Sequence, residues 1–126
     1  MNRVLFMAVT AFFVLAGCGS TDQAGDSCST ENSGSCTSST EALFCNDGKF
    51  RAVPCSGPSG CTQGDKQFVC DFSRAKPGEA CPKSVEGSAQ CDVNNADQDL
   101  KCVSGTWQAQ TCKACTVQSG NIVCSP

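Results

Sequence analysis

The cysteines of this chain form two sets of six that recur in the same order along the sequence. The first set is Cys28, Cys36, Cys45, Cys55, Cys61 and Cys70, and the second is Cys81, Cys91, Cys102, Cys112, Cys115 and Cys124. Neighbouring residues recur as well: "GDSC" becomes "GEAC", "LFCNDGKF" becomes "LKCVSGTW", and "FVC" becomes "IVC". The pattern indicates a tandem duplication of one six-cysteine unit, with length changes confined to the loops between the motifs.

Each unit has too few large apolar residues to be stabilised by a hydrophobic core alone. Chains poor in Leu, Ile, Val and Phe are normally disordered, and disulfides offset this deficit by restricting the unfolded chain. We therefore predict a small, disulfide-rich, mostly β fold: two tandem six-cysteine modules, each a β-hairpin with a third strand, after a signal helix. The expected divisions are a signal peptide over residues 1–17, a lipidated flexible tether over 18–25, module 1 over 26–71, a linker over 72–78 and module 2 over 79–126.

A tight turn is predicted at the same place in each module. In module 1 the strands "ALFC" and "KFRAVPC" flank Asn46, Asp47 and Gly48, residue types that tolerate the positive φ of a hairpin turn. Module 2 repeats the pattern around Ser104 and Gly105. Each module therefore contains a hairpin whose turn is set by local sequence.

Phe50 and Trp107 occupy matched positions just after these turns. We interpret both as the main core anchors of their modules, because large aromatic side chains contribute most to a small core. The alternative is an exposed aromatic platform for a ligand, which the sequence favours slightly more for Trp107 than for Phe50.

The twelve cysteines of the two sets are expected to form six disulfides, three within each module and none between modules. The sequence alone does not choose among the pairings that six cysteines allow. The preferred local bridges are Cys61–Cys70 and Cys115–Cys124, because each pair flanks one hairpin-length loop. Disulfides at this density indicate an oxidising compartment outside the cytoplasm.

The thirteenth cysteine, Cys18, lies directly after an apolar segment and outside both sets. Arg3 provides a positive start, residues 4–16 are apolar except for Thr10, and small residues follow, as in a secretory signal peptide. The stretch "LAGC" resembles the lipobox of bacterial lipoproteins. The resemblance implies that Cys18 is lipidated, that the chain is cut before it, and that acyl chains hold the protein on a membrane. Because Gly19 rather than aspartate follows, the resemblance also implies the outer membrane.

No catalytic centre, metal site or cofactor is predicted. Histidine is absent, which removes the commonest general base, and zinc would need a histidine or a second CxxC pair. Cys112 and Cys115 form a single CxxC pair without the helix start that thiol oxidoreductases place there, so we interpret them as structural. The acidic stretch with Asp92, Asn94, Asp97 and Asp99 lacks the glycine and the glutamate of a calcium loop.

Charge excludes another class of partner. The chain has a formal net charge of −3 and no basic cluster, whereas nucleic-acid binding depends on neutralising phosphates with Lys and Arg. We expect no nucleic-acid partner.

The stretch "CSGPSGC" followed by "FVCDFS" and "GEAC" resembles small cysteine-rich lipoproteins of gliding myxobacteria. In module 1 the likeness includes Gly57, Pro58 and Gly60, and in module 2 it includes Trp107. The resemblance implies a cell-surface role, with gliding motility as one process that such proteins serve.

These observations together predict an anchored, non-catalytic interaction or structural module of the cell envelope. Its expected partners are the outer membrane, through the N-terminal acyl chains, and an envelope protein or polysaccharide. The residues considered as partner contacts are Gly57, Pro58 and Trp107. The alternative function is an inhibitor-like module whose rigid loops block a target hydrolase.

Replacing Cys18 with serine removes the thiol that the lipobox resemblance assigns to lipidation. The expected result is an uncut precursor without acyl mass, measured by mass spectrometry of the membrane fraction. The unaltered chain should fractionate with the outer membrane. A mature protein with an unmodified Cys18, or recovery in the inner membrane, would contradict the assignment.

Overall fold

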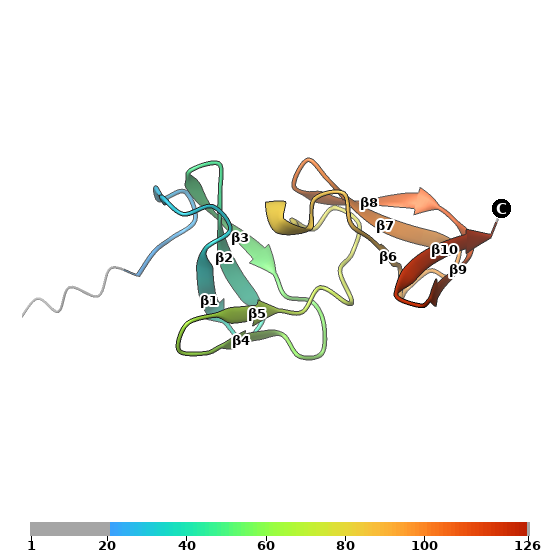
Figure 1. Cartoon of the computed structure of the whole chain (residues 1–126), viewed down its shortest axis with the longest axis horizontal. Coiled ribbons are helices and arrows are strands. Elements are labelled where there is room, and N and C mark those ends of the chain that lie inside the picture. Colours follow the sequence, from blue (N-terminus) through green and yellow to red (C-terminus); the bar gives the residue numbers. More distant parts are fainter. Residues whose placement is uncertain (1–20, 126) are drawn as a thin grey trace, which may run out of the picture.

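The computed structural model describes residues 21–125 as two β modules side by side along the long axis of the molecule (Figure 1). Module 1 contains a three-stranded antiparallel sheet in the order β1-β2-β3 and a two-stranded ribbon of β4 and β5. Its strands are β1 (Gly34–Ser38), β2 (Glu41–Asn46), β3 (Lys49–Pro54), β4 (Cys61–Gln63) and β5 (Phe68–Cys70).

Module 2 repeats this arrangement with a sheet in the order β6-β7-β8 and a ribbon of β9 and β10. Its elements are the short 3₁₀ helix η1 (Lys83–Val85) and the strands β6 (Ala89–Cys91), β7 (Gln98–Val103), β8 (Thr106–Thr111), β9 (Lys113–Gln118) and β10 (Asn121–Ser125). The mostly β, disulfide-rich fold class is confirmed. Each module has five strands rather than the three expected, because segments such as "GSCTS" and "CTQ" are polar and lack the alternation that marks a strand.

The hairpin turn of each module lies where the sequence places it. Asp47 and Gly48 have φ of 53° and 77°, and Ser104 and Gly105 have φ of 52° and 76°. Positive φ at both central residues defines the type I′ turn, whose twist matches that of the flanking strands. The register is the same in both hairpins, since Cys45 pairs with Phe50 and Cys102 with Trp107.

Six disulfides hold the modules, and each lies within one module. They join Cys28–Cys45, Cys36–Cys61 and Cys55–Cys70 in module 1, and Cys81–Cys102, Cys91–Cys115 and Cys112–Cys124 in module 2. Counted within each set of six, both modules join the first cysteine to the third, the second to the fifth and the fourth to the sixth. The modules therefore share one connectivity.

The preferred bridges Cys61–Cys70 and Cys115–Cys124 are wrong. The members of each pair do face one another across a ribbon, but they are bonded to other cysteines. A bond inside the ribbon would close a short loop and therefore restrict the unfolded chain only a little. It would also leave the ribbon as an isolated hairpin, which is marginally stable in water. The observed bonds instead fasten the ribbon to the neighbouring sheet and span 25 residues from Cys36 to Cys61.

Each module has a small core around its disulfides. Module 1 buries Ala42, Phe44, Val53 and Cys55 together. In module 2 the core contains Leu100 and Trp107, and Trp107 is only 3 % exposed. The prediction that Trp107 is a core anchor is confirmed, and its proposed role as a partner contact is wrong because no face of the ring is free.

The expected linker over residues 72–78 contributes to both cores. Phe72 packs against the core of each module, with ring centroids 6.1 Å from Phe44 and 6.4 Å from Trp107. Ala75 is 2 % exposed and lies within the core of module 2. The two modules are thus joined by apolar packing as well as by the chain.

The N-terminal part of the described chain is held against module 1. Gln23 and Asp26 form a turn in which the Gln23 N–H donates to Asp26 Oδ2 at 2.8 Å, and the Gly25 N–H donates to the Phe50 carbonyl at 2.8 Å. Residues 23–25, expected to belong to a flexible tether over 18–25, are therefore held against module 1, and residues 18–20 lie outside the described part of the chain.

The signal peptide over residues 1–17, with Cys18 and Gly19, lies outside the described residues. Within residues 21–125, no helix is long and apolar enough to cross a membrane.

Replacing Phe72 with alanine should lower the free energy of unfolding by about 2 kcal/mol. Phe-to-Ala changes in cores cost about 3–5 kcal/mol, and Phe72 is partly exposed. Guanidinium denaturation with disulfides intact measures the loss, and emission from Trp107, the single tryptophan, should shift to the red as its neighbour is removed. Val69 is 62 % exposed, so Val69→Ala is the control and should change stability by less than about 0.5 kcal/mol. A Phe72→Ala protein as stable as this control would contradict the packing role.

Candidate functional site

The matched aromatic residues Phe50 and Trp107 have the same backbone partners. The Gly25 N–H donates to the Phe50 carbonyl, and the Gly78 N–H donates to the Trp107 carbonyl, both at 2.8 Å. The return bonds also match, since the Phe50 N–H donates to the Asp26 carbonyl at 2.9 Å and the Trp107 N–H to the Glu79 carbonyl at 2.8 Å. The backbone frame around the two rings is therefore the same.

The two rings nevertheless differ in exposure. Trp107 is covered by apolar residues that precede its module, among them Phe72 and Ala75. When Gly25 is matched with Gly78, the position of Ala75 corresponds to Asp22, which is exposed. Phe50 therefore lacks the apolar residues that cover Trp107 and remains partly exposed. The prediction that Phe50 is the main core anchor of module 1 is wrong. Comparing the polar residues before module 1 with the apolar ones before module 2 could have revealed this difference.

Phe50 lines a surface hollow of about 440 Å³, the Phe50 hollow. The hollow runs along β3, which is an edge strand of its sheet. Its lining residues are Ala24, Gly25, Asn46, Asp47, Lys49, Phe50, Arg51 and Ala52. Neighbouring residues of a strand point to opposite faces, so the Phe50 ring shares its face with the paired Cys45, whereas Asn46, Lys49 and Arg51 lie on the other face. The hollow therefore follows the edge of β3, with the aromatic ring on one side and amide and charged groups on the other.

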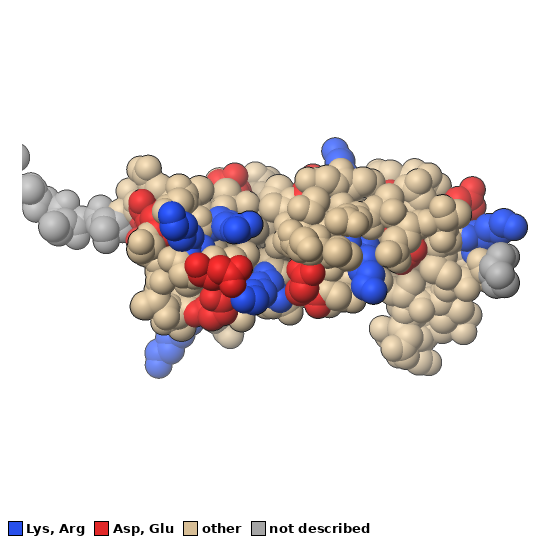
Figure 2. Space-filling view, turned by 90° about the horizontal axis from the view of Figure 1, so that it is seen from above, with Lys and Arg blue, Asp and Glu red and all other residues tan. Residues whose placement is uncertain are grey.

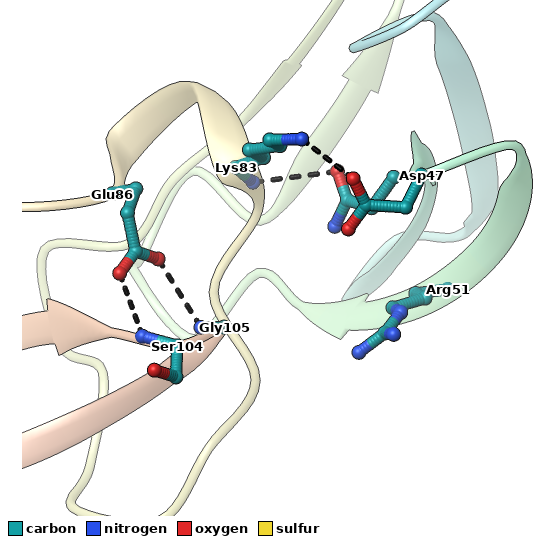
Figure 3. Close-up of a pocket in the computed structure, with 7 residues that line it drawn as sticks. Asp47, Arg51, Lys83, Glu86, Ser104 and Gly105 are labelled. Carbon is teal, nitrogen blue, oxygen red and sulfur yellow. Dashed lines mark hydrogen bonds and ion pairs between the residues drawn. The ribbon is translucent and has the colours of Figure 1, made fainter.

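A second hollow of about 280 Å³, the inter-module cleft, shares lining residues with the first and is drawn in Figure 3. Module 1 contributes Asn46, Asp47 and Arg51, and module 2 contributes Lys83, Glu86, Ser104 and Gly105. The residues Asn46, Asp47 and Arg51 line both hollows. The cleft is thus built from the two matched hairpin turns and η1.

Lys83 ties module 2 to the turn of module 1. Its Nζ lies 2.6 Å from Asp47 Oδ1 and 3.7 Å from Glu31 Oε1, and its backbone N–H donates to Asn46 Oδ1 at 3.3 Å. The hydrogen bond and positive charge of Lys83 lower the pKa of Asp47, and the same contact with Asp47 raises the pKa of Lys83. Both side chains are more than half exposed, so the pair orients the two turns more than it stabilises the fold.

A glutamate caps each hairpin turn, which sequence reasoning missed. Glu86 accepts the Ser104 N–H at 2.6 Å and the Gly105 N–H at 3.2 Å. Glu31 accepts the Asp47 N–H at 3.2 and 3.1 Å in the matched position of module 1. A glutamate shortly after the first cysteine of each set was the available signal. Both carboxylates accept hydrogen bonds from backbone N–H groups of residues that line the inter-module cleft.

The "SGPSG" loop is shaped by hydrogen bonds to Asp71. Asp71 Oδ2 accepts the Ser59 N–H at 3.0 Å and Oδ1 accepts the Ser73 N–H at 2.9 Å, and these bonds lower the pKa of Asp71. A side chain at Gly57 would collide with this carboxylate, since its Cβ would lie 2.0 Å from Asp71 Cγ. Gly57 therefore has a structural role, whereas Pro58 is exposed. Neither lines the Phe50 hollow or the inter-module cleft.

The other motifs of the sequence are also accounted for by local structure. Cys112 and Cys115 are bonded to Cys124 and Cys91 rather than to each other, which agrees with the interpretation that the CxxC pair is structural. In the acidic stretch, the buried Asp92 accepts the Asn94 N–H through Oδ1 at 2.8 Å. This Asx turn orders the loop from within.

One comparison with known proteins bears on module 1. Residues 8–64 match the family model described as "Carbohydrate binding domain (family 19)". The matched stretch includes the β2–β3 hairpin with Phe50 and Arg51, ends before β5, and begins among residues that the structure does not describe. No curated protein and no solved structure matches the chain. The likeness is to a family of non-catalytic binding domains, consistent with the non-catalytic role expected from the sequence.

Replacing Lys83 with methionine should raise the pKa of Asp47 toward its ordinary value, because the partner that lowers it is removed. A depressed carboxyl pKa stabilises the folded state above the ordinary range near pH 4. The stability difference between the unaltered protein and Lys83→Met should therefore close as pH falls through the lowered pKa of Asp47. It should also close at alkaline pH, as pH rises through the raised pKa of Lys83.

Carboxyl NMR titration measures this change. The pKa of Asp71 serves as an internal control and should stay low, since backbone N–H groups of Ser73 and Ser59 set it. Lys66→Met is the matched control, because Lys66 takes no part in either hollow. An Asp47 pKa unmoved by Lys83→Met would contradict the assigned contact.

Proposed function

We propose that this protein binds carbohydrate without catalysis, through the Phe50 hollow of module 1. The observation that carries the proposal is the partly exposed ring of Phe50, within the stretch that matches the carbohydrate binding domain model. Its counterpart Trp107 is buried under the linker, so module 2 offers no equivalent platform. Module 2 instead supplies the far wall of the inter-module cleft.

The chemistry of the hollow suits a sugar. A sugar ring presents apolar C–H groups on its faces and hydroxyl groups at its edge, and an aromatic ring packs well against the C–H face. Asn46 is 6 % exposed and holds its amide in place by accepting the Lys83 N–H. This amide and the Arg51 guanidinium lie on the face of the hairpin opposite the Phe50 ring, so they can donate hydrogen bonds to hydroxyl oxygens of a sugar chain that passes around the edge of β3.

We further propose that Cys18 is lipidated and anchors the protein in the outer membrane. The support is the lipobox resemblance and the predicted signal peptide. Ala24, which lines the Phe50 hollow, is six residues after Cys18, and an extended chain of this length spans roughly 20 Å. Carbohydrate would then be bound close to the membrane surface.

The process that this binding serves is proposed from resemblance alone. The likeness to lipoproteins of gliding myxobacteria favours a cell-surface or motility complex in which the protein attaches to a polysaccharide. Loss of gliding on deletion of the gene, with rescue by the unaltered chain but not by Phe50→Ala, would support this role.

Replacing Phe50 with alanine should weaken binding to polysaccharide about tenfold. Loss of a partly exposed aromatic contact is worth roughly 1–2 kcal/mol, and the ring makes no essential core contact. The measurement is co-sedimentation of the mature protein, purified in detergent, with a panel of insoluble polysaccharides that includes chitin, cellulose and peptidoglycan. Phe50→Trp should retain binding, and Val117→Ala, a change at a 62 % exposed residue of module 2, is the control. Binding unaffected by Phe50→Ala would overturn the proposed site, and binding to none of a broad panel would overturn the function.

A further inference from the structure

The strand β8 has an outer edge that no other strand covers. The sheet order β6-β7-β8 places β8 at the margin of its sheet, and Figure 1 shows no ribbon beyond the arrowhead end of this strand. At the start of the edge, the N–H and C=O groups of Trp107 are bonded to Glu79 and Gly78. Alternate residues of a strand direct these groups to the same side. The N–H and C=O groups of Ala109 and Thr111 therefore also point away from β7.

These outward groups are available to a partner. In the part of the chain that the structure describes, the N–H and C=O groups of Ala109 and Thr111 make no backbone hydrogen bond on this side. Residues 108–111 are all exposed, so a strand from outside can reach them. Unpaired backbone donors and acceptors along a sheet edge are a template for pairing with a further strand.

The matched edge strand of module 1 has protection that β8 lacks. In β3, Lys49 and Arg51 are exposed and Pro54 is the last residue, and charged side chains and proline at an edge hinder the addition of another strand. The matched positions of β8 are uncharged and none is proline: they are Thr106, Gln108 and Thr111. The edge of β8 is therefore open to pairing, whereas that of β3 is not.

The open edge is complementary to itself. When two copies of β8 lie antiparallel about Gln110, Ala109 of each copy faces Thr111 of the other, and each such pair can exchange both N–H···O bonds. The two Gln110 side chains then lie opposite one another, where each amide can donate to and accept from its twin. Because β8 contains no Lys, Arg, Asp or Glu, no like charges within the strands oppose this pairing.

The surface around this edge is also poor in charge. Figure 2 looks at the molecule from above, the side on which Figure 1 shows β8, and mainly uncharged residues cover the half farthest from the grey N-terminal residues. A second copy of the chain, which has the same net charge, can approach this side with little local repulsion.

We propose that β8 is a dimerisation edge that pairs antiparallel with β8 of a second copy of this chain. The two sheets then form one continuous sheet in the order β6-β7-β8-β8-β7-β6, and the two-fold interface uses the same residues on both copies. Because Gly78 and Glu79 already occupy the groups of Trp107, the pairing is confined to the end of the strand. The dimer is therefore weak, with a Kd roughly in the micromolar to millimolar range.

This inference is independent of the proposed carbohydrate binding. The pairing residues Ala109, Gln110 and Thr111 line neither the Phe50 hollow nor the inter-module cleft. Both sites therefore remain accessible to a ligand in each copy of the dimer.

The first test replaces Thr111 with proline. The change removes an outward N–H without breaking a bond to β7, and Pro54 already occupies the matched position in β3. Sedimentation equilibrium of the mature protein in density-matched detergent measures the monomer–dimer equilibrium. We expect the unaltered protein to dimerise and Thr111→Pro to weaken the dimer at least about tenfold, with a melting temperature within about 4 °C of the unaltered protein.

The second test exchanges charges at the two-fold centre. Gln110→Lys and Gln110→Glu each place like charges opposite one another, so each variant alone should dimerise about tenfold more weakly. An equimolar mixture of the two should regain the affinity of the unaltered protein, because the opposite residues then attract. Gln118→Lys and Gln118→Glu are the matched controls, since Gln118 is an exposed residue of β9 outside the edge, and they should leave the dimer unchanged.

The third test identifies the occupant in cells. Gln110 is replaced by the photoreactive residue benzoylphenylalanine, and irradiation should give an adduct of twice the mass of the chain, cross-linked within residues 108–112 of the second copy. The same replacement of Arg51, which lies on the protected edge strand β3, should give no such adduct. An adduct of Gln110 with a different envelope protein would overturn pairing with a second copy.

Two further results would contradict the inference. One is a protein that stays monomeric up to about 1 mM, where even a weak dimer should form. The other is a dimer that neither Thr111→Pro nor the two Gln110 variants weaken, since it would then use another surface. If the Gln110 variants weaken the dimer but their mixture does not restore it, the antiparallel pairing about Gln110 is wrong.

Discussion

The side chain of Phe72 lies between Phe44 of one module and Trp107 of the other, and the placement of the two modules depends on this contact. Each core is too small to bury a large surface by itself, so one shared aromatic adds to both. The exposed Lys83–Asp47 pair could not fix the same geometry, because exposed ion pairs contribute little and are screened by salt. The inter-module cleft, with walls from both hairpin turns, therefore exists because an apolar residue between the modules holds them together.

The two modules have similar frames that differ in the segment preceding each of them. Disulfide connectivity, turn conformation, the glutamate cap and the backbone bonds to the aromatic residue all match between the modules. The segment preceding each module differs, because apolar residues cover Trp107 and polar ones leave Phe50 open. Residues outside the repeated frame thus decide whether the matched aromatic ring is buried or partly exposed.

The features that were predictable from sequence are those set by local chemistry. The fold class, the two type I′ turns and the confinement of disulfides to each module follow from Asx-Gly and Ser-Gly dipeptides and from two even sets of cysteines. The cysteine pairing was wrong because facing cysteines such as Cys61 and Cys70 are joined to a neighbouring sheet instead, and this depends on tertiary structure. The candidate site was missed for the same reason: both aromatics were interpreted as core anchors, with an exposed platform as an alternative slightly favoured for Trp107, and only the packing of the linker shows that Phe50 is the more open one.

None of the six disulfides joins two cysteines that are neighbours in the cysteine order: Cys28 bypasses Cys36, and Cys112 bypasses Cys115. A chain oxidised while it emerges from its N-terminal end presents Cys28 and Cys36 together before Cys45 arrives. Rapid oxidation would then trap a non-native bond, and escape requires attack by a free thiol and exchange of partners. Uncatalysed exchange is slow. The yield of correctly folded protein therefore depends more on the rate at which disulfides are exchanged than on the rate at which thiols are oxidised. Both modules have this connectivity, so each of them needs such disulfide exchange.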